Sequence, residues 1–207
     1  MRDTEQFRPP APLLHPGSRA YILHVRVAAQ RMLLNCGNRC LREYIISTSL
    51  RGPGERAGSG RTPRGWHRVV RWIGTGRAPG TVFVSRRFTG EVIPRKAWRG
   101  AGAPDLILSR ILRLRGLEPG RNAGHGCDSY ARYIYIHGTN QEHRLGTPAS
   151  HGCIRMANRD VIDLFNRTRG TPTYCYIDDA TSAVPAARAR ANAPRDGRAS
   201  PRSKRNP

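Results

Sequence analysis

The stretch 132–137, Arg-Tyr-Ile-Tyr-Ile-His, constrains the fold most, because it is apolar on both faces of an extended chain. Side chains of a strand alternate between two faces, so Tyr133 and Tyr135 share one face and the two isoleucines share the other. A strand with one solvated face alternates apolar and polar residues, whereas a strand buried on both faces does not. We therefore predict a central strand of a sheet, with His137 at its end.

Other short segments are rich in β-branched and aromatic residues and are separated by glycine- and proline-rich stretches, which is typical of strands and loops. We predict strands at Tyr21–Val27, Glu43–Ser47, Trp66–Ile73, Thr81–Ser85, Leu106–Leu114 and Thr173–Ile177, and a loop at Arg51–Arg64. The first two strands flank a predicted turn at Asn35–Arg39. Leu106–Leu114 also has the apolar content of a short helix, and that alternative stays open.

One helix is predicted at Arg159–Asn166, where apolar residues recur at helical spacing. Asn158 precedes it as a predicted N-cap, and Gly170 follows it as a helix-ending residue. Many strands and one helix, without an internal repeat, indicate a mostly β domain, either a sandwich or a curled sheet, with its site at the end of a strand.

The charge of the chain is strongly positive, with 36 Lys and Arg against 14 Asp and Glu and a formal net charge of +22. Such a surface attracts polyanions, so nucleic acid, anionic lipid and anionic cell-wall polymers are admissible partners, although a GC-rich coding bias also produces many arginines. Residues 181–207 lack apolar periodicity and are predicted to form a disordered basic tail. Residues 1–20 are predicted to form an irregular arm, which leaves 21–180 as the folded domain.

We expect neither a membrane-spanning segment nor a secretory signal from the sequence. No run of eighteen apolar residues occurs, so we expect no transmembrane segment. Residues 1–17 combine charged residues with prolines and lack the apolar core of a secretory signal, so no signal peptide is readable.

Five cysteines make an odd number, so at least one thiol stays unpaired within a monomer, as a nucleophile requires. Cys36 and Cys40 are compatible with a small disulfide loop, with part of a metal site or with two positions of a hairpin. No second cysteine pair with zinc-like spacing accompanies them, which argues against the metal site.

His137 and Cys153 are the residues whose chemistry indicates catalysis. A free cysteine is mostly a thiol at neutral pH, so a nucleophilic one needs a base or a lowered pKa. The sixteen-residue separation of the two residues allows a loop that folds back and brings the imidazole to the sulfur. Gly152 directly before the thiol permits close backbone approach, and the N–H groups of residues 151–153 are candidates for an oxyanion hole.

A second His-Gly-Cys tripeptide occurs at residues 125–127, without the serine that precedes the first. We interpret it as a mobile loop over the site in which Cys127 is dispensable. In an alternative, His125, Cys127, His151 and Cys153 together bind zinc, because they are ligand types that four-coordinate zinc uses. We expect no metal and no organic cofactor.

The segments His137–Thr139 and Ser150–Met156 closely resemble the signature of the L,D-transpeptidase catalytic domain, a family that cross-links bacterial peptidoglycan. The pattern reads His-Gly-Thr, a spacer, and Ser-His-Gly-Cys-Ile-Arg-Met. Weaker matches occur in the expected order at Ile46–Thr48 and Thr62–Gly65, and the resemblance extends over roughly Glu43–Ile177.

The resemblance implies a β-sandwich-like fold with a short helix after the catalytic cysteine, and a two-step acyl transfer without a cofactor. Cys153 attacks the carbonyl of the third residue of a tetrapeptide stem, expels the terminal D-residue and forms a thioester. A side-chain amine of a second stem, water or a lipoprotein lysine then resolves the thioester. His137 is implied as the base, with its other ring nitrogen on a backbone carbonyl such as that of Gly138.

The resemblance also assigns the residues around this pair. Arg155 is expected to meet the carboxylate of the peptide through its planar guanidinium group. His151 is a structural or substrate contact, and the remaining substrate-binding or oxyanion set is Ser150, Gly152 and Gly138. The implied partners are peptidoglycan stem peptides, the implied place is the periplasm or cell envelope, and we expect a monomer.

Two other hypotheses about function compete with that of an L,D-transpeptidase. A basic nucleic-acid-binding protein fits the charge, but the sequence lacks a recognisable nucleic-acid motif or clustered stacking aromatics. Binding that depends steeply on salt and survives Cys153→Ala would favour it. A catalytically silent wall-binding module is the other reading, and the intact His137 and Cys153 pair argues against it.

Overall fold

The protein is described by a computed structural model that covers residues 19–98 and 104–179. The predicted tail, and the predicted arm except for its last two residues, lie outside the described residues. The strands are β1 (Tyr21–Arg26), β2 (Arg31–Cys36), β3 (Arg39–Ser47), β4 (Gly65–Ile73), β5 (Thr81–Val84), β6 (Arg87–Val92), β7 (Ile107–Gly116), β8 (Tyr135–Thr139), β9 (Ile154–Met156) and β10 (Thr173–Asp178). One α-helix, α1 (Asn158–Thr168), accompanies them in the described part, together with short 3₁₀ turns at Arg95–Ala97 and Glu142–Arg144.

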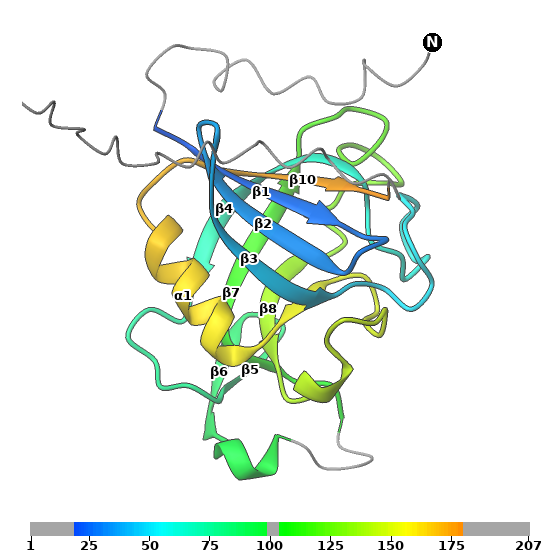
Figure 1. The fold of residues 1–207 in the computed structure, drawn as a ribbon. Coiled ribbons are helices and arrows are strands. Elements are labelled where there is room, and N and C mark those ends of the chain that lie inside the picture. Colours follow the sequence, from blue (N-terminus) through cyan, green and yellow to red (C-terminus); the bar gives the residue numbers. More distant parts are fainter. Residues whose placement is uncertain (1–18, 99–103, 180–207) are drawn as a thin grey trace, which may run out of the picture.

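The strands form one sheet that curls until it closes on itself. Its order is β4-β10-β1-β2-β3-β9-β8-β7-β5-β6, and β4 pairs with β7 as well as with β10. The pairs β1–β10 and β8–β9 are parallel, and the other neighbouring strands are antiparallel. Figure 1 shows the consequence, with β1, β2, β3 and β10 facing β4, β7 and β8. This mostly β, sandwich-like architecture confirms the predicted fold class.

The main core lies between the facing halves of the sheet and includes one side of α1. Leu23 and Leu34 from one half, and Leu112 and Ile136 from the other, are fully buried in a single cluster. Phe165 joins them from the helix, as predicted from the helical spacing of its apolar residues. Burying each such side chain contributes about 1.5–3 kcal/mol to folding, so the sheet and the helix are stabilised by the same interior.

The predicted central strand is central, although it starts later than predicted. β8 lies between β7 and β9, and all five of its residues are buried. Tyr133 precedes the strand with a φ of 57° and a side chain that is 54% exposed, so it does not share a buried face with Tyr135. That correction matters for the site, because the backbone of Tyr133 turns back toward Cys153.

Three further corrections concern turns and ends. The segment predicted as two strands around one turn contains three, because the chain also turns at Val27–Gln30. Strand β6 was not predicted, since its residues are all exposed and carry no apolar alternation. Asn158 is not the N-cap of α1 but its first residue, and Ala157 occupies the cap position without a side-chain bond. Leu106–Leu114 is strand rather than helix, as β7 shows.

Candidate active site

The candidate catalytic residues lie on neighbouring parallel strands. In the register of β8 and β9, Ile136 is opposite Ile154 and His137 is opposite Arg155. The two isoleucines belong to the main core, so His137 and Arg155 point to the other face of the sheet. Cys153 directly precedes β9 on that same face, diagonal to His137, and strand spacing and rise place their Cα atoms about 8 Å apart.

The ring of His137 is fixed by its own strand. Its Nδ1 lies 2.8 Å from the carbonyl oxygen of Gly138, and because a carbonyl can only accept, Nδ1 carries the proton and donates. The Nε2 atom therefore keeps its lone pair for a proton. Burial lowers the pKa of His137 below its ordinary value, which keeps the imidazole neutral at pH 7.

The thiol of Cys153 is held in an apolar setting. It packs against a cluster formed by Phe83, Ile111 and Tyr135, and it donates to the carbonyl oxygen of Tyr133 at 3.4 Å. Desolvation raises the pKa of Cys153 to about 11, although the backbone N–H of Tyr135 and the charges of two arginines act in the opposite direction. At rest the two candidate residues are thus a neutral thiol and a neutral imidazole, a combination that suits proton transfer during attack rather than before it.

The turn before Cys153 is held by two hydroxyl groups. Ser150 Oγ donates to the carbonyl of Cys153 at 2.6 Å and accepts from the N–H of Gly152 at 3.2 Å. Thr62 Oγ1 donates to the carbonyl of Gly152 at 3.0 Å. Because the N–H of Gly152 is engaged by Ser150, the N–H groups of His151 and Cys153 are the better candidates for an oxyanion hole.

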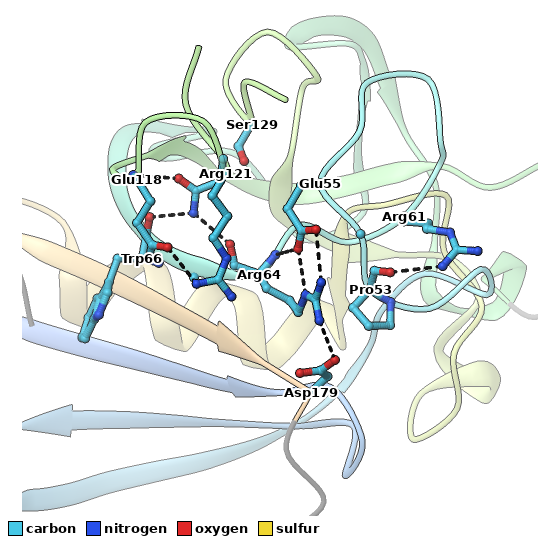
Figure 2. A network of polar contacts seen from close by, with 12 residues as sticks. Pro53, Glu55, Arg61, Arg64, Trp66, Glu118, Arg121, Ser129 and Asp179 are labelled. Atoms are coloured by element: carbon cyan, nitrogen blue, oxygen red, sulfur yellow. Dashed lines mark hydrogen bonds and ion pairs between the residues drawn. The ribbon is translucent and has the colours of Figure 1, made fainter. Parts of the chain in front are cut away.

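The loop that presents Thr62 is itself braced by arginines. Arg132 donates to the carbonyls of Glu55 and Arg61 at 2.5 and 2.6 Å, which ties this loop to the chain just before β8. Figure 2 shows Arg64 between Glu55 and Asp179, with bonds of 2.7 and 2.9 Å. The loop backbone thereby reaches Gly152, where a Cβ atom would lie 3.3 Å from the carbonyl oxygen of Arg61, and the φ of 128° at Gly152 is one that favours glycine.

Arg155 is not arranged as the resemblance led us to expect. Its side chain is 1% exposed, it forms an ion pair with Asp105, and it donates to Gln141 Oε1 at 3.1 Å. In this structure the guanidinium group of Arg155 is already paired with Asp105, so it is not free to meet a peptide carboxylate. Asp105 was not predicted as a site residue, because it belongs to no motif. It comes close to Arg155 through the pairing of β7 with β8 and of β8 with β9.

The remaining predicted site residues fall into exposed and packed positions. His151 is exposed, and its Nδ1 lies 4.0 Å from Asp105 Oδ2 at the rim of the site. Gly138 has no room for a side chain, since a Cβ atom would lie 2.4 Å from Asn158 Oδ1 and 2.7 Å from the carbonyl of Leu108. Ser150 is buried in the turn described above.

All five cysteines are free thiols. Cys36 lies on β2 and Cys40 on β3, the two strands of one hairpin, which agrees with the interpretation of this pair as two hairpin positions. Cys127 is buried, with its sulfur near the carbonyl oxygens of its own loop. Among the described residues, no three His, Cys, Asp or Glu side chains gather as a metal site would require, so the four residues of the zinc alternative do not form one.

Comparison with known proteins agrees with the motif. Residues 20–177 match the profile of the YkuD family, described as the L,D-transpeptidase catalytic domain. No curated protein sequence matches the chain.

Solved structures similar to the chain include three L,D-transpeptidases. The enzyme from Mycobacterium smegmatis is 13% identical over 76% of this chain and 58% of its own, with a TM-score of 0.44. The enzyme from Xylanimonas cellulosilytica is 18% identical over 83% and 65%, with a TM-score of 0.43. L,D-transpeptidase 3 from Mycobacterium tuberculosis, solved with a faropenem-derived adduct, is 14% identical over 77% and 60%, with a TM-score of 0.46.

This chain spans about three fifths of the length of the M. smegmatis and M. tuberculosis structures. Within the described residues, no helix is long and apolar enough to cross a membrane. The family match covers more than half of the sequence and includes both strands of the site, and the chain therefore belongs to the L,D-transpeptidase catalytic domain family.

Proposed function

We propose that the protein is a peptidoglycan L,D-transpeptidase that uses Cys153 as its nucleophile and His137 as its general base. The observation that carries this proposal is the tautomer of His137, whose Nδ1 donates to the carbonyl of Gly138 while Nε2 stays available on the face that holds the thiol. Because the pKa of Cys153 is raised, the thiol proton must be removed by a base as the sulfur attacks. An imidazole held on a strand, with Nδ1 bonded and Nε2 open, can act as that base.

The proposed reaction has two steps. The sulfur of Cys153 bonds to the carbonyl carbon of the third stem residue, its proton passes to Nε2 of His137, and the backbone N–H groups at residues 151 and 153 stabilise the oxyanion. The imidazolium then gives the proton to the departing amine of the terminal D-residue, which leaves a thioester. The amine of a second stem resolves the thioester in transpeptidation, and water resolves it in the carboxypeptidase reaction.

The family acts on peptidoglycan, so we propose the periplasm or cell envelope as the place of action and stem peptides as the partners. All the residues that the mechanism uses belong to one chain, which is consistent with a monomeric catalytic unit. No step requires a metal ion or an organic cofactor.

The experiment that tests the proposal is the intact mass of the protein after incubation with a carbapenem, a β-lactam class that acylates the thiol of this family. We expect one stoichiometric adduct on the wild type and on Cys127→Ala, and none on Cys153→Ala. Cys127 is the matched control because it follows the second His-Gly pair. A folded wild type without an adduct, or one acylated equally well after Cys153→Ala, would contradict the proposal.

A further inference from the structure

Cationic side chains lie beside the thiol in an arrangement that the proposed mechanism does not use. In the register of β7 and β8, Arg113 is opposite Tyr135, and Tyr135 lies beside Cys153 across the next strand pair. These three side chains therefore form a row across the face of the sheet that carries His137. The row places a guanidinium group two strands away from the nucleophile, about 10 Å between Cα atoms.

Arg113 is buried without a compensating charge. The residue is 6% exposed, its Nε has no hydrogen-bond partner, and no carboxylate among residues 19–98 and 104–179 forms an ion pair with it. Its guanidinium group stacks 3.3 Å from the ring centre of Tyr130 and donates to the carbonyl of Tyr130 at 3.0 Å. A buried cation that keeps an unused donor costs stability, so its presence beside the thiol calls for an anionic partner.

A second arginine reaches the same place from the β5–β6 hairpin. Ser85, with a φ of 57°, makes the tight turn that directs Arg86 back over the sheet. Arg86 donates to the hydroxyl of Tyr135 at 3.0 Å and lies 4.8 Å from the ring centre of Tyr133. Arg113 lies 5.8 Å from the same ring, so both guanidinium groups border the tyrosine whose carbonyl accepts the thiol proton.

The surroundings add positive rather than negative charge. Arg71 is opposite Arg113 in the register of β4 and β7, and Arg68 is opposite Arg115. Like charges opposite one another on a sheet face repel, which an anion between them would relieve. Asp128 is an acid near Arg115: backbone N–H bonds from its own loop and the charge of Arg115 lower its pKa, so its carboxylate is already engaged.

We propose that Arg86 and Arg113 form a carboxylate-binding subsite beside Cys153 that selects stem peptides bearing a free carboxylate near the scissile bond. The proposal rests on the proposed function for the identity of the substrate. Planar guanidinium groups bind a carboxylate through paired N–H donors, and stacking on tyrosine rings keeps their planes fixed. The carboxylate is supplied either by the terminal D-residue that leaves or by the side chain of the third residue, and substrates amidated at one position or the other distinguish the two.

The first test needs no peptide substrate. Iodoacetate and iodoacetamide alkylate the same sulfur, but only iodoacetate carries a carboxylate. We expect the ratio of their rates at Cys153 to be about tenfold higher in the wild type than in Arg86→Gln, because the paired guanidinium contact is lost. Arg113→Lys, which keeps the charge without the planar fork, should lower the ratio by a smaller factor.

Arg77→Gln is the matched control for this experiment. Arg77 is exposed and its guanidinium group lies 4.2 Å from the ring centre of Phe88, so the variant loses one charge and one stacked arginine elsewhere. In Arg77→Gln the ratio of the iodoacetate rate to the iodoacetamide rate at Cys153 should stay at the wild-type value. An equal ratio in wild type, Arg86→Gln and Arg77→Gln overturns the subsite, and Arg86→Gln decides the matter if Arg113→Lys does not fold.

The second test uses tetrapeptide stems with each carboxylate either free or amidated. At the stem position whose carboxylate the subsite binds, we expect Arg86→Gln to raise the KM of the free acid about tenfold. The KM of the stem amidated at that position should be the same in the wild type and in Arg86→Gln. Equal effects on acid and amide at both positions contradict the inference. If no stem is turned over but the iodoacetate ratio still depends on Arg86, then the proposed function fails while the carboxylate subsite stands.

Discussion

At the scale of single residues, the candidate site combines a thiol that resists ionisation with an imidazole that resists protonation. Cys153 has a raised pKa and His137 a lowered one, and both shifts come mainly from burial. Cys153 packs against the apolar cluster of Phe83, Ile111 and Tyr135, a setting that favours the neutral thiol. His137 is buried whereas Cys153 is half-buried, so the imidazole is shielded from water while the thiol stays open to a substrate.

The pH dependence of acylation follows from these two shifts. If His137 is the base, loss of its proton creates the active form, so the rate should rise with pH around a midpoint below about pH 6.5, the ordinary histidine value, and then level off. In His137→Ala the thiol must ionise unaided, so the plateau should vanish and the rate should keep rising toward pH 11. At pH 7 we expect a loss of about 10²- to 10⁴-fold. Carbapenem acylation measured from pH 5 to 10 checks this, and an unchanged profile in the variant would exclude His137 as the base.

Gly138 is the residue through which the base depends on the backbone. Gly138→Ala would place a Cβ atom 2.7 Å from the carbonyl of Leu108 and 2.4 Å from Asn158 Oδ1. We expect a loss of about 1–3 kcal/mol in the free energy of unfolding and a larger loss of activity, because the carbonyl that holds His137 moves. Chemical denaturation and carbapenem acylation measure the two effects. Gly90→Ala is a control for activity and not for stability, because a Cβ there would meet no atom within 4 Å, although the φ of 92° disfavours alanine; acylation should stay at the wild-type rate.

The sequence predicted some of these residues better than others. The expected bond from His137 to the carbonyl of Gly138 is present, since it depends only on neighbours in the chain. The ion pair of Arg155 with Asp105 was not predicted, since Asp105 lies fifty positions earlier in the sequence. Contacts between adjacent residues can be read from a motif, whereas the partner of a buried charge is decided by strand pairing.

At the scale of elements, the spacer between His137 and Cys153 does more than close a loop. It carries Glu142, whose Oε1 accepts from the backbone N–H of Asn158 at 2.7 Å and from its Nδ2 at 2.9 Å. The carboxylate thus satisfies a free donor at the start of α1, where negative charge is also favoured by the helix dipole. Asn158 then accepts from Ser109 on β7, which links the helix, the spacer and the strand beside the site.

Replacing Glu142 should lower the free energy of unfolding, because the contact between the spacer and α1 is lost. Glu142→Ala leaves the N–H of Asn158 without its acceptor, and we expect a loss of about 1–2 kcal/mol. Glu142→Gln keeps an acceptor but removes the charge, so the loss should be about 0.3–1 kcal/mol. Urea denaturation provides both values. Equal stability of wild type and Glu142→Ala would show that the spacer does not anchor the helix.

Elements with apolar periodicity were predicted well, and elements defined by tertiary contacts were not. The turn at Val27–Gln30 contains no glycine or proline, and it is held by Gln30, whose Nε2 donates to the carbonyl of Val27 and to Thr48 Oγ1. Strand β6 has no buried residue and exists because it pairs with β5. Neither the turn nor β6 has a local sequence pattern from which it could be predicted.

At the scale of the whole molecule, the closed sheet buries polar groups as well as apolar ones. His67 on β4 is fully buried, accepts from Ser129 Oγ at 2.9 Å and donates to the carbonyl of Gly65 at 3.0 Å. Desolvation lowers the pKa of His67 to about 4. The second pairing of β4, with β7, produces this burial, and nothing in the sequence predicts that a sheet will close rather than stay open.

A histidine buried in its neutral form makes folding sensitive to acid. The unfolded chain binds a proton at His67 below about pH 6.5, whereas the folded protein does so only near pH 4. Stability from this residue is therefore present above pH 6.5 and falls as the pH drops, by about 3 kcal/mol at pH 4. The difference in unfolding free energy between wild type and His67→Gln, measured from pH 7 to 4, should shrink by that amount. A difference that does not vary with pH would contradict the assignment.

The parallel pairing of β1 with β10 also sets how the domain responds to mechanical load. Tyr21 lies beside Thr173 and Arg26 beside Asp178, so the chain enters the domain at one end of this strand pair and leaves it at the opposite end. A force that pulls on both ends of the chain would slide the two strands past each other and load all of their hydrogen bonds together, rather than opening them one at a time. Under such a load the domain would resist extension through β1 and β10, the first and last strands of the described residues.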